Sequence, residues 1–454
     1  MTNRTHRIVK TATAFSAVAA LSAAGVAAAE EPTAAELKAQ LEALQQKVEQ
    51  LESGSDRATE AERDDAIGRV LDEAAAESEL LSMQGFTAGY NKGFELRSED
   101  GSFRLNPYFQ FQLRYVFNVA EGDGEDIQGL SNDFERFDDG FELRRMRFGA
   151  KGNAFTEKLE YKFQFTADRS GGDVAVDDAW IIYEFADNWA FRTGQWKDNV
   201  YLEENISSSR QMAVDRSLVH ELIAGGYTDR VQGVSLIYAD DTSRAEVALT
   251  DGANSDNTNY TRGGLDRPEY GVSGRYEFKV LGDSWGPSRD FSNVVRPVDE
   301  DFLMVGVGAN FSDFADEWAL AHGADVLYKT AAQPLSLFAA YYGFLADDGG
   351  DTSYNAALEA QVAYGLGDKQ EVFARGGIYL EDLDNNSEVF DDINDNVIEL
   401  TVGYNYYFEG HAAKVTIDGT WLPEGSPSSQ SGIGVVESDD ENQLIFRGQF
   451  QLLL

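Results

Sequence analysis

Basic side chains recur at alternate positions in one part of the sequence, where they could attract a small anion. Arg145, Arg147 and Lys151 are separated by even numbers of residues, with apolar residues between them. Residues with this spacing lie on one face of a β-strand. Arg114 and Lys162 fall on the polar faces of two further alternating segments. Several cations on one face, between low-dielectric walls, would create a positive field that concentrates anions.

A long segment without alternation, residues 196–226, carries further charges. Its candidate cations are Lys197, Arg210 and Arg216, and its carboxylates include Glu203, Glu204 and Asp215. If this segment folds against the basic face, its cations would add to the positive field and its carboxylates would oppose it. Alternatively, the basic side chains pair with carboxylates such as Glu160 and Asp168 and serve only to hold the structure together. The sequence leaves both interpretations open.

Groups for nucleophilic, redox or metal chemistry are sparse. The chain has no cysteine, and its four histidines, His6, His220, His322 and His411, belong to no metal-binding or catalytic motif. We therefore predict no enzyme, no catalytic residues, no cofactor and no metal site. The acidic stretches, such as residues 381–395, lack the spacing of a calcium loop and are predicted to be solvated loops. A net charge of −42 argues against nucleic acid as a partner.

The elements that position the basic residues are predicted to be long β-strands. Between residues 107 and 118, aromatic and aliphatic side chains alternate with Gln, Arg and Asn, and residues 158–168 repeat the pattern. Such alternation gives a strand one apolar face and one polar face. The last residues alternate in the same way, with Phe446, Phe450 and Leu454 on one face and Arg447 and Gln449 on the other.

The number and length of these segments predict a closed barrel. Beyond the first 29 residues, no apolar run is long enough for a membrane-spanning helix. Strands of about 9–11 residues, tilted, are sufficient to cross a bilayer, and bacterial barrels have even strand numbers. We count about sixteen candidate strands, including one near residues 85–97, and predict an all-β, 16-stranded antiparallel transmembrane barrel over residues 83–454. A barrel of this size encloses water.

The first 29 residues have the pattern of a cleaved signal peptide. A basic start with Arg4, Arg7 and Lys10 precedes an alanine-rich apolar run, which ends in three alanines before Glu30. The interpretation as a membrane anchor is disfavoured because the run is short and only weakly apolar. Residues 1–29 are therefore predicted to direct export of the chain.

Residues 30–82 are predicted to form a periplasmic coiled coil followed by an acidic spacer. Leu37, Leu41, Leu44, Val48 and Leu51 are spaced alternately by four and three residues, which is typical of one coiled-coil seam. So short a helix is unstable alone and needs a partner. The spacing favours an oligomeric stalk, with a solvated single helix as the alternative.

Several short motifs, in order along the chain, resemble one known family. They are Gly93–Leu105, Leu143–Gly152, Asp178-Ala179-Trp180, Arg192–Lys197, Asp215–Leu218 and Arg230–Gly233. Together they resemble the phosphate-selective porin O/P family of trimeric outer-membrane porins. The N-terminal heptads are also compatible with this family, whose members can carry a coiled coil before the barrel.

The resemblance implies a homotrimeric porin of the bacterial outer membrane, surrounded by lipid and lipopolysaccharide. Its function would be passive diffusion of small hydrophilic solutes, including phosphate or other small anions that pass a basic constriction. The candidate constriction residues are Arg114, Arg145, Arg147, Lys151, Lys162, Lys197, Arg210 and Arg216. The alternative is a structural barrel that anchors the periplasmic stalk. Liposome swelling would distinguish the two, because a plugged anchor passes no solute.

Overall fold

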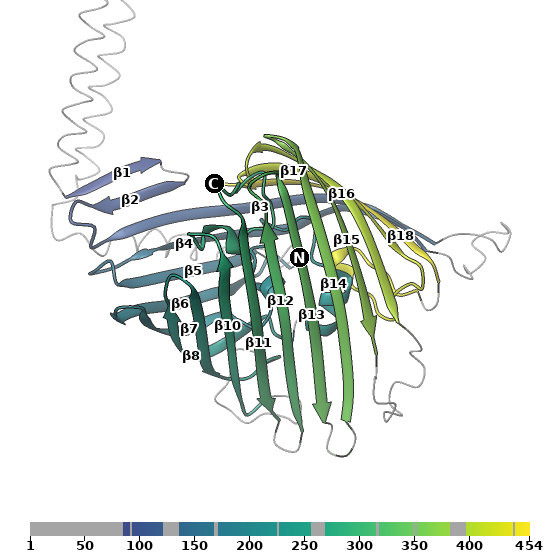
Figure 1. Cartoon of the computed structure of the whole chain (residues 1–454), viewed down its shortest axis with the longest axis horizontal. Coiled ribbons are helices and arrows are strands. Elements are labelled where there is room, and N and C mark those ends of the chain that lie inside the picture. The colour runs from purple at the N-terminus through teal and green to yellow at the C-terminus, as the bar shows by residue number, and fades with distance from the viewer. Residues whose placement is uncertain are drawn as a thin grey trace, which may run out of the picture. The chain divides into compact units, whose positions relative to one another are not determined.

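The computed structural model describes most of the predicted barrel region (Figure 1). The described residues are 85–90, 93–120, 136–167, 171–224, 227–255, 268–314, 317–347, 350, 352–381, 396–438 and 441–454. The predicted signal peptide at residues 1–29 lies outside the described residues. So do the predicted coiled coil and spacer at residues 30–82.

The described chain is almost entirely β-structure. The strands are β1 (Phe86–Tyr90), β2 (Phe94–Ser98), β3 (Arg104–Ala120), β4 (Arg136–Asn153), β5 (Leu159–Ala167), β6 (Val174–Ala186), β7 (Trp189–Lys197), β8 (Arg230–Ala239), β9 (Ser243–Thr250), β10 (Tyr270–Leu281), β11 (Phe302–Asp313), β12 (Trp318–Lys329), β13 (Leu335–Asp347), β14 (Thr352–Gly367), β15 (Gln370–Leu380), β16 (Val397–Glu409), β17 (Ala413–Leu422) and β18 (Gln443–Leu453). The short helices are α4 (Leu202–Asn205), α5 (Leu218–Ala224), η1 (Gly286–Arg289) and η3 (Ser431–Ile433). Among the described residues, no helix is long and apolar enough to cross a bilayer.

Strands β3 to β18 form a closed antiparallel ring. Each strand pairs with its neighbours in sequence, and β18 pairs with β3, so the ring contains sixteen strands. The C-terminal residue completes this seam, because Leu454 and Phe109 exchange two backbone hydrogen bonds of 2.9 Å. The predicted 16-stranded barrel is therefore confirmed.

The segment near residues 85–97, which was counted among the candidate strands, is not part of the ring. It forms a hairpin of β1 and β2, which is hydrogen-bonded to β3 at the ladder pairs Leu96–Leu105 and Arg97–Arg104. Its alternation arises from a local hairpin, which the sequence pattern does not distinguish from a wall strand.

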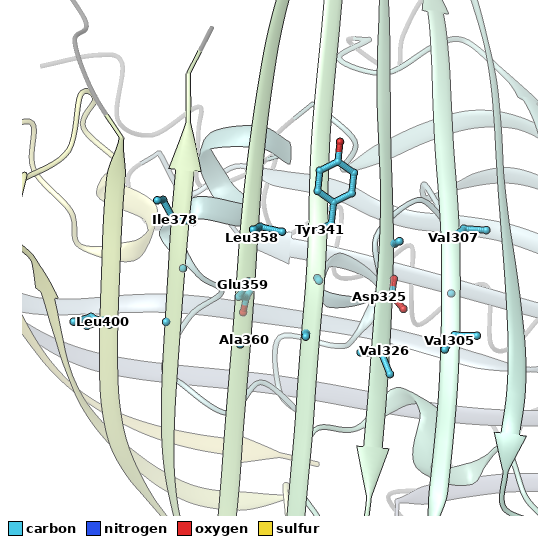
Figure 2. A pocket seen from close by; sticks show the side chains of 16 residues that line it. Val305, Val307, Asp325, Val326, Tyr341, Leu358, Glu359, Ala360, Ile378 and Leu400 are labelled. Atoms are coloured by element: carbon cyan, nitrogen blue, oxygen red, sulfur yellow. The ribbon is translucent and has the colours of Figure 1, made fainter. Parts of the chain in front are cut away.

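The outer face of the ring is apolar. On β11, Val305 and Val307 are exposed, and so are Leu358 on β14 and Leu400 on β16 (Figure 2). On β18, Phe446 is 51% exposed whereas the next residue, Arg447, is 3% exposed. A protein surrounded by water would bury such side chains, so their exposure along the whole wall indicates a lipid-facing surface.

The inner face is polar and charged. Gln112 on β3, Glu399 on β16 and Gln451 on β18 are at most 1% exposed, and many other buried polar side chains alternate with the outer apolar ones. The predicted inward direction of Arg114 is confirmed, because it is 1% exposed and contacts residues inside the ring. This inversion of the usual soluble pattern puts the charged chemistry inside the barrel.

The connections differ between the two ends of the barrel. At the end that holds the C-terminus, most connections are short, such as residues 187–188 between β6 and β7 and residues 368–369 between β14 and β15. At the other end they are longer, as between β7 and β8. Short periplasmic turns and long external loops are typical of outer-membrane barrels. One connection at the C-terminal end departs from this rule, since residues 282–301 join β10 to β11.

Candidate functional site

Residues 198–229, between β7 and β8, fold into the barrel and form the candidate constriction. Tyr201 donates a hydrogen bond to the Gly343 carbonyl on β13, at 3.2 Å. The Ser208 hydroxyl lies 3.1 Å from Gln110 Nε2 on β3. Because this one connection contacts strands on opposite parts of the ring, it crosses the lumen rather than lying outside it. The prediction that residues 196–226 could fold inward agrees with these contacts.

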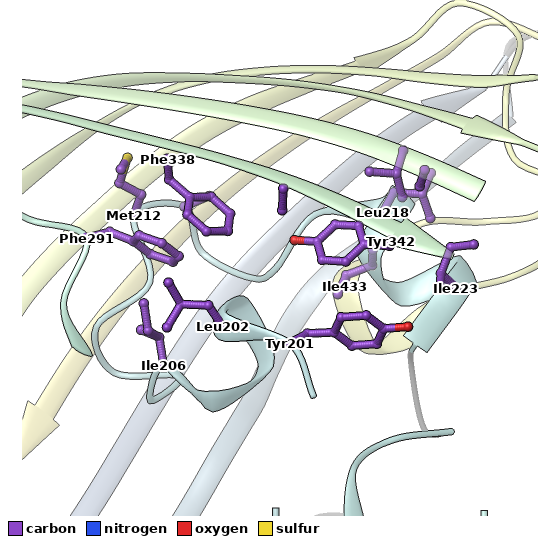
Figure 3. Packing of buried hydrophobic residues seen from close by; sticks show 14 of the residues in the cluster. Tyr201, Leu202, Ile206, Met212, Leu218, Ile223, Phe291, Phe338, Tyr342 and Ile433 are labelled. Atoms are coloured by element: carbon purple, nitrogen blue, oxygen red, sulfur yellow. The ribbon is translucent and has the colours of Figure 1, made fainter. Parts of the chain in front are cut away.

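An apolar cluster holds this lumenal loop against the wall. Tyr201, Leu202 and Ile206 from the loop are at most 1% exposed, and they belong to one cluster with Phe338 and Tyr342 of β13 (Figure 3). Helix α5 adds Leu218, Val219 and Ile223 to the cluster. Complete burial of a large aliphatic side chain contributes about 1.5–3 kcal/mol. The loop is therefore a packed part of the barrel interior.

Close backbone approach adds to this anchoring. On β11, Gly308 lies against the loop, and a Cβ at this position would be only 2.2 Å from the Val200 carbonyl oxygen. That oxygen also accepts a 2.9 Å hydrogen bond from Arg275 Nη1 on β10. Glycine is thus required at this contact, because any side chain would push the loop backbone away.

A buried carboxylate fixes the beginning of the loop. Asp198 accepts hydrogen bonds of 2.6 Å from Ser273 on β10 and from Asn310 on β11. Burial raises the pKa of Asp198 to about 6, although both hydrogen bonds favour its ionised form. The contact is therefore sensitive to pH in the mildly acidic range.

Two further connections enter the lumen. In residues 282–301, Asp290 and Phe291 are completely buried, and Asp290 lies 3.0 Å from His411 Nε2. In residues 423–442, the carbonyl of Gly432 accepts a 2.9 Å hydrogen bond from Arg114 Nη2. Together with the lumenal loop, these segments narrow the interior of the barrel.

Three wall arginines converge on one loop carboxylate. Asp215 is buried, and it pairs with Arg114 of β3 and with Arg144 and Arg145 of β4. Arg144 and Arg145 each lie 3.1 Å from Asp215 Oδ1. Burial alone would raise the pKa of Asp215, but the positive field of the three arginines lowers this pKa well below its ordinary value. We call Arg114, Arg144 and Arg145 the arginine cluster.

Four other predicted cations are also paired. On the wall, Arg147 lies 2.9 Å from Asp177, and Lys162 pairs with Asp178. Lys197, at the end of β7, and Arg216, in the loop, both pair with Glu204. Of the anticipated partners, Asp168 lies outside the described residues, and no described cation forms an ion pair with Glu160.

Lys151 and Arg210 differ from the other six candidates. Neither has an ion pair with any described residue; Arg210 donates one hydrogen bond, of 3.4 Å, to the Arg289 carbonyl. Lys151 is solvent-exposed and lies directly opposite Lys162 in the β4–β5 ladder. The charges of Arg210 and Lys162 both act on Lys151. We call Lys151, Lys162 and Arg210 the cationic cluster; within it Asp178 neutralises Lys162, so two positive charges remain.

Arg144 was not among the predicted site residues. Strict alternation places it opposite Arg145, on the lipid-facing side. The β3–β4 ladder pairs Gln112 with Arg145 and Leu113 with Leu143, so it skips Arg144. This β-bulge lets two consecutive arginines reach the same carboxylate. In the sequence, only the adjacent position of Arg144 and Arg145 indicated that Arg144 could belong to the site.

Basic lumenal residues are not limited to the strands that carry the predicted cations. Strands β10 to β18 also carry six buried lumenal cations, which are Arg275, Lys279, Lys329, Arg375, Lys414 and Arg447. Five of them bond to carboxylates or to backbone carbonyls of the inward connections, as Lys414 does to the Gln211 carbonyl. Lys279 instead lies over the Trp285 ring, with its Nζ 5.7 Å from the ring centroid. Their positions on the polar faces of alternating strands could have identified them.

Glu204, His220 and Glu221 could together offer three metal ligands. One ligand atom from each lies within 4.8 Å of the others, and both His220 ring nitrogens are buried without a hydrogen-bond partner among the described residues. However, Lys197 and Arg216 already pair with Glu204. Burial alone would raise the pKa of Glu204, but these cations lower it well below its ordinary value. Because Lys197 and Arg216 already neutralise Glu204, this group of residues has little remaining attraction for a metal cation.

Comparison of the sequence with known families identifies the central part of the chain. Residues 117–314 match the sequence pattern of phosphate-selective porin O and P. The match confirms the resemblance to the phosphate-selective porin O and P family that the sequence motifs indicated. The matched region contains the whole lumenal loop and all of the predicted site residues except Arg114. No curated protein matches the chain at a significant level.

Solved porins share the fold. The anion-selective porin from Comamonas acidovorans superposes with a TM-score of 0.54 at 11% identity, over 77% of this chain and 99% of that one. OprB of Pseudomonas putida superposes with a TM-score of 0.51 at 10% identity, over 77% of this chain and 94% of that one. Identities this low establish a common barrel fold. With the family match, they support a channel-type barrel of the bacterial outer membrane.

Proposed function

We propose that this porin-family barrel is a passive diffusion channel for small hydrophilic solutes and that it prefers small anions such as phosphate. The observation that carries the proposal is a polar lumen with a packed loop across it, inside a wall that is apolar outside. Such a loop reduces the cross-section of the channel without closing the barrel wall. Selectivity would then be set where solutes meet charged side chains at the narrowest part.

The proposed solute path follows the β4–β6 wall. Lumenal side chains remain exposed there, including Lys151, Glu160 on β5 and Glu184 on β6. On the side of β11 to β16, by contrast, the loop packs against the wall in the apolar cluster. Water-filled space beside β4–β6 is consistent with this distribution of exposure.

The cationic cluster supports the preference for anions. Most lumenal charges occur as ion pairs, which contribute little to the field at a distance because their charges cancel. Lys151 and Arg210 have no such partner among the described residues. The charge of Glu160 opposes that of Lys151, and the charge of Asp290 opposes that of Arg210. On β5, Glu160 lies opposite Ile182, two ladder pairs farther from the β5–β6 turn than Lys162, which lies opposite Trp180. Two cations without ion pairs to described residues would favour anions at their level of the lumen.

Planar-bilayer recordings of the full-length protein test the channel proposal. We expect stepwise ion conductance and, in a salt gradient, a reversal potential that indicates anion preference. A strong cation preference would contradict the anion proposal while leaving the channel in place. Complete absence of conductance and of solute flux into liposomes would instead favour the alternative function, a barrel that anchors a periplasmic stalk.

We further propose a homotrimer that carries a periplasmic coiled coil and spacer at residues 30–82, after removal of residues 1–29. The heptad spacing of five apolar residues and the family match support this assembly. The native mass of the detergent-extracted protein, with and without residues 30–82, measures it. A monomeric mass for the complete mature protein would exclude the trimer.

A further inference from the structure

A hollow of about 740 Å³ lies on the outer face of the wall, over strands β11 to β16 (Figure 2). Its floor is a row of small residues on neighbouring strands, in which Ala339 pairs with Ala360 and Ala360 pairs with Gly376. The larger side chains of Val326 and Leu400 border this row on its two sides. Because the outer wall faces lipid, an apolar hollow at this position can hold an acyl chain.

Three hydrogen-bonded polar side chains, His322, Tyr341 and Tyr354, lie at one end of the hollow, and we call them the polar triad. Tyr341 lines the hollow, and its hydroxyl bonds to the Tyr354 hydroxyl and lies 3.1 Å from His322 Nε2. The rings of His322 and Tyr354 stack, with their centroids 6.1 Å apart. Gly343 leaves room for the triad, because a Cβ there would be 2.5 Å from His322 Nε2. By the alternation of β12, β13 and β14, all three side chains face the lipid, where polar groups without partners are costly.

The polar triad presents one hydrogen-bond donor to the membrane. His322 Nδ1 is buried and has no hydrogen-bond partner among the described residues. Since a buried N–H is rarely left unpaired, the proton of the neutral ring belongs on Nε2, which donates to the Tyr341 hydroxyl. The Tyr341 hydroxyl then donates to Tyr354. Within the described part of the chain, no further group accepts the proton of the Tyr354 hydroxyl, so it can be donated to a lipid.

This donor lies in the outer leaflet of the membrane. Strand β12 begins with Trp318 at the end of the barrel that has the longer loops, and aromatic side chains mark the membrane interfaces of such barrels. Tyr354 is the third residue of β14, so it lies about 5 Å inside the external end of its strand. Ala339 and Ala360 lie farther from that end, toward the bilayer centre. A lipid of the outer leaflet could therefore place a carbonyl group beside Tyr354 and an acyl chain in the hollow.

We propose that the hollow binds one acyl chain of lipopolysaccharide, the outer-leaflet lipid of the outer membrane, and that the Tyr354 hydroxyl donates a hydrogen bond to a carbonyl oxygen of this lipid. A second copy of the chain is a less suitable occupant. The chain enters the ring at β3, so a coiled coil at residues 30–82 would favour contacts between copies near that strand. In the ring, at least four strands separate β13 and β14 from β3. The inference requires the lipid-facing wall and is independent of the channel function.

The test measures the lipid that remains bound to the full-length protein after extraction from outer membranes in mild detergent, by native mass spectrometry. We expect the wild type to retain lipopolysaccharide. Gly376→Leu should fill the floor of the hollow, since a Cβ at Gly376 makes only ordinary contacts, the nearest at 3.5 Å. Its dissociation constant for purified lipid A, the acylated part of lipopolysaccharide, should rise at least about tenfold, the effect of losing the burial of about two methylene groups.

Gly448→Leu is the matched control. Gly448 lies on the outer face of β18, and a Cβ there would contact nothing within 4 Å. The same substitution therefore adds the same apolar side chain to the wall outside the hollow, and the dissociation constant should equal that of the wild type. If Gly376→Leu and Gly448→Leu bind lipid A equally well, the site is rejected.

Tyr354→Phe tests the hydrogen bond and covers the case in which Gly376→Leu does not assemble. It removes only the hydroxyl, so the dissociation constant for lipid A should rise about two- to tenfold. An unchanged constant would reject the proposal. A phospholipid that the wild type retains in place of lipopolysaccharide, and that Gly376→Leu loses, would overturn the choice of lipopolysaccharide as the occupant.

Discussion

Neutralising two lumenal cations that form no ion pair with a described residue should weaken anion preference in a predictable way. Lys151 lies on β4 opposite Lys162, and Arg210 lies in the lumenal loop near it. Replacing both with glutamine removes two charges and keeps side chains of similar length. Neither change breaks an ion pair to a described residue, so the loop should stay in place.

The expected magnitude follows from Coulomb's law. An ion that passes at about 7 Å interacts with a unit charge by about 0.6 kcal/mol in water, and salt at 0.1 M reduces this to about 0.3 kcal/mol. Removing the charge disfavours an anion and favours a cation by the same amount. The anion-to-cation permeability ratio should therefore fall about threefold per charge, and about sevenfold for the double variant.

Reversal potentials in a potassium chloride gradient measure this ratio. The matched control is Lys369→Gln, which removes a lysine from the exposed turn between β14 and β15, outside the lumen. Its permeability ratio should equal that of the wild type. The effect of the double variant should also shrink near 1 M salt, where the Debye length is only about 3 Å.

An unchanged permeability ratio in a correctly assembled double variant would refute the assignment of selectivity to Lys151 and Arg210. The same measurement on Arg145→Gln has a different physical meaning. That change removes one of three donors to Asp215, so it disturbs the loop anchor as well as the charge. If the permeability ratio changes strongly in Arg145→Gln and not in the double variant, selectivity depends on the arginine cluster instead of on Lys151 and Arg210.

Two further predictions concern the anchoring of the loop. Gly308→Ala should displace the loop at Val200 and increase open-channel current noise. The control is Gly448→Ala, whose Cβ would contact nothing within 4 Å, so its current noise should equal that of the wild type. Because folding raises the pKa of Asp198 to about 6, the loop should be most firmly held below about pH 4, with this stabilisation lost as the pH rises through 6. Current noise should rise over that range, and Asp198→Asn should remove this part of the dependence; persistence of the full dependence would assign it to other groups.

The barrel itself could be predicted because its signal is local. Each strand must place apolar side chains toward lipid and polar ones toward water, so alternation alone identifies the strands and their faces. The same pattern gave the correct direction for Arg114. The alternation pattern failed at Arg144. A β-bulge adds one residue to the strand there, which changes the face that a side chain occupies, and no clear feature of the amino-acid composition indicates it.

The ion-pair partners could not be predicted, because they depend on contacts between distant segments. Asp215 meets Arg114 across 101 positions of the sequence, and the Val214 amide meets Asp418 across 204 positions. The inward path of residues 282–301 is equally non-local: its Asp290 reaches His411 near the β16–β17 turn. Sequence spacing carries no information about such contacts, although it correctly indicated that the loop after β7 was unusual.

Selectivity in this barrel should depend on which charges lack partners rather than on the total charge. The chain carries a net charge of −42, which taken alone would predict attraction of cations. Inside the ring, however, carboxylates such as Asp177, Asp178 and Asp215 are paired with arginine or lysine, and a closely paired charge produces only a weak field a few ångströms away. Under the proposed function, the field that a passing ion experiences depends on the exposed groups beside β4–β6, which include the carboxylates Glu160 and Glu184 as well as Lys151. We therefore predict the ion preference from the positions of these groups and not from the net charge, to which loops that salt screens also contribute.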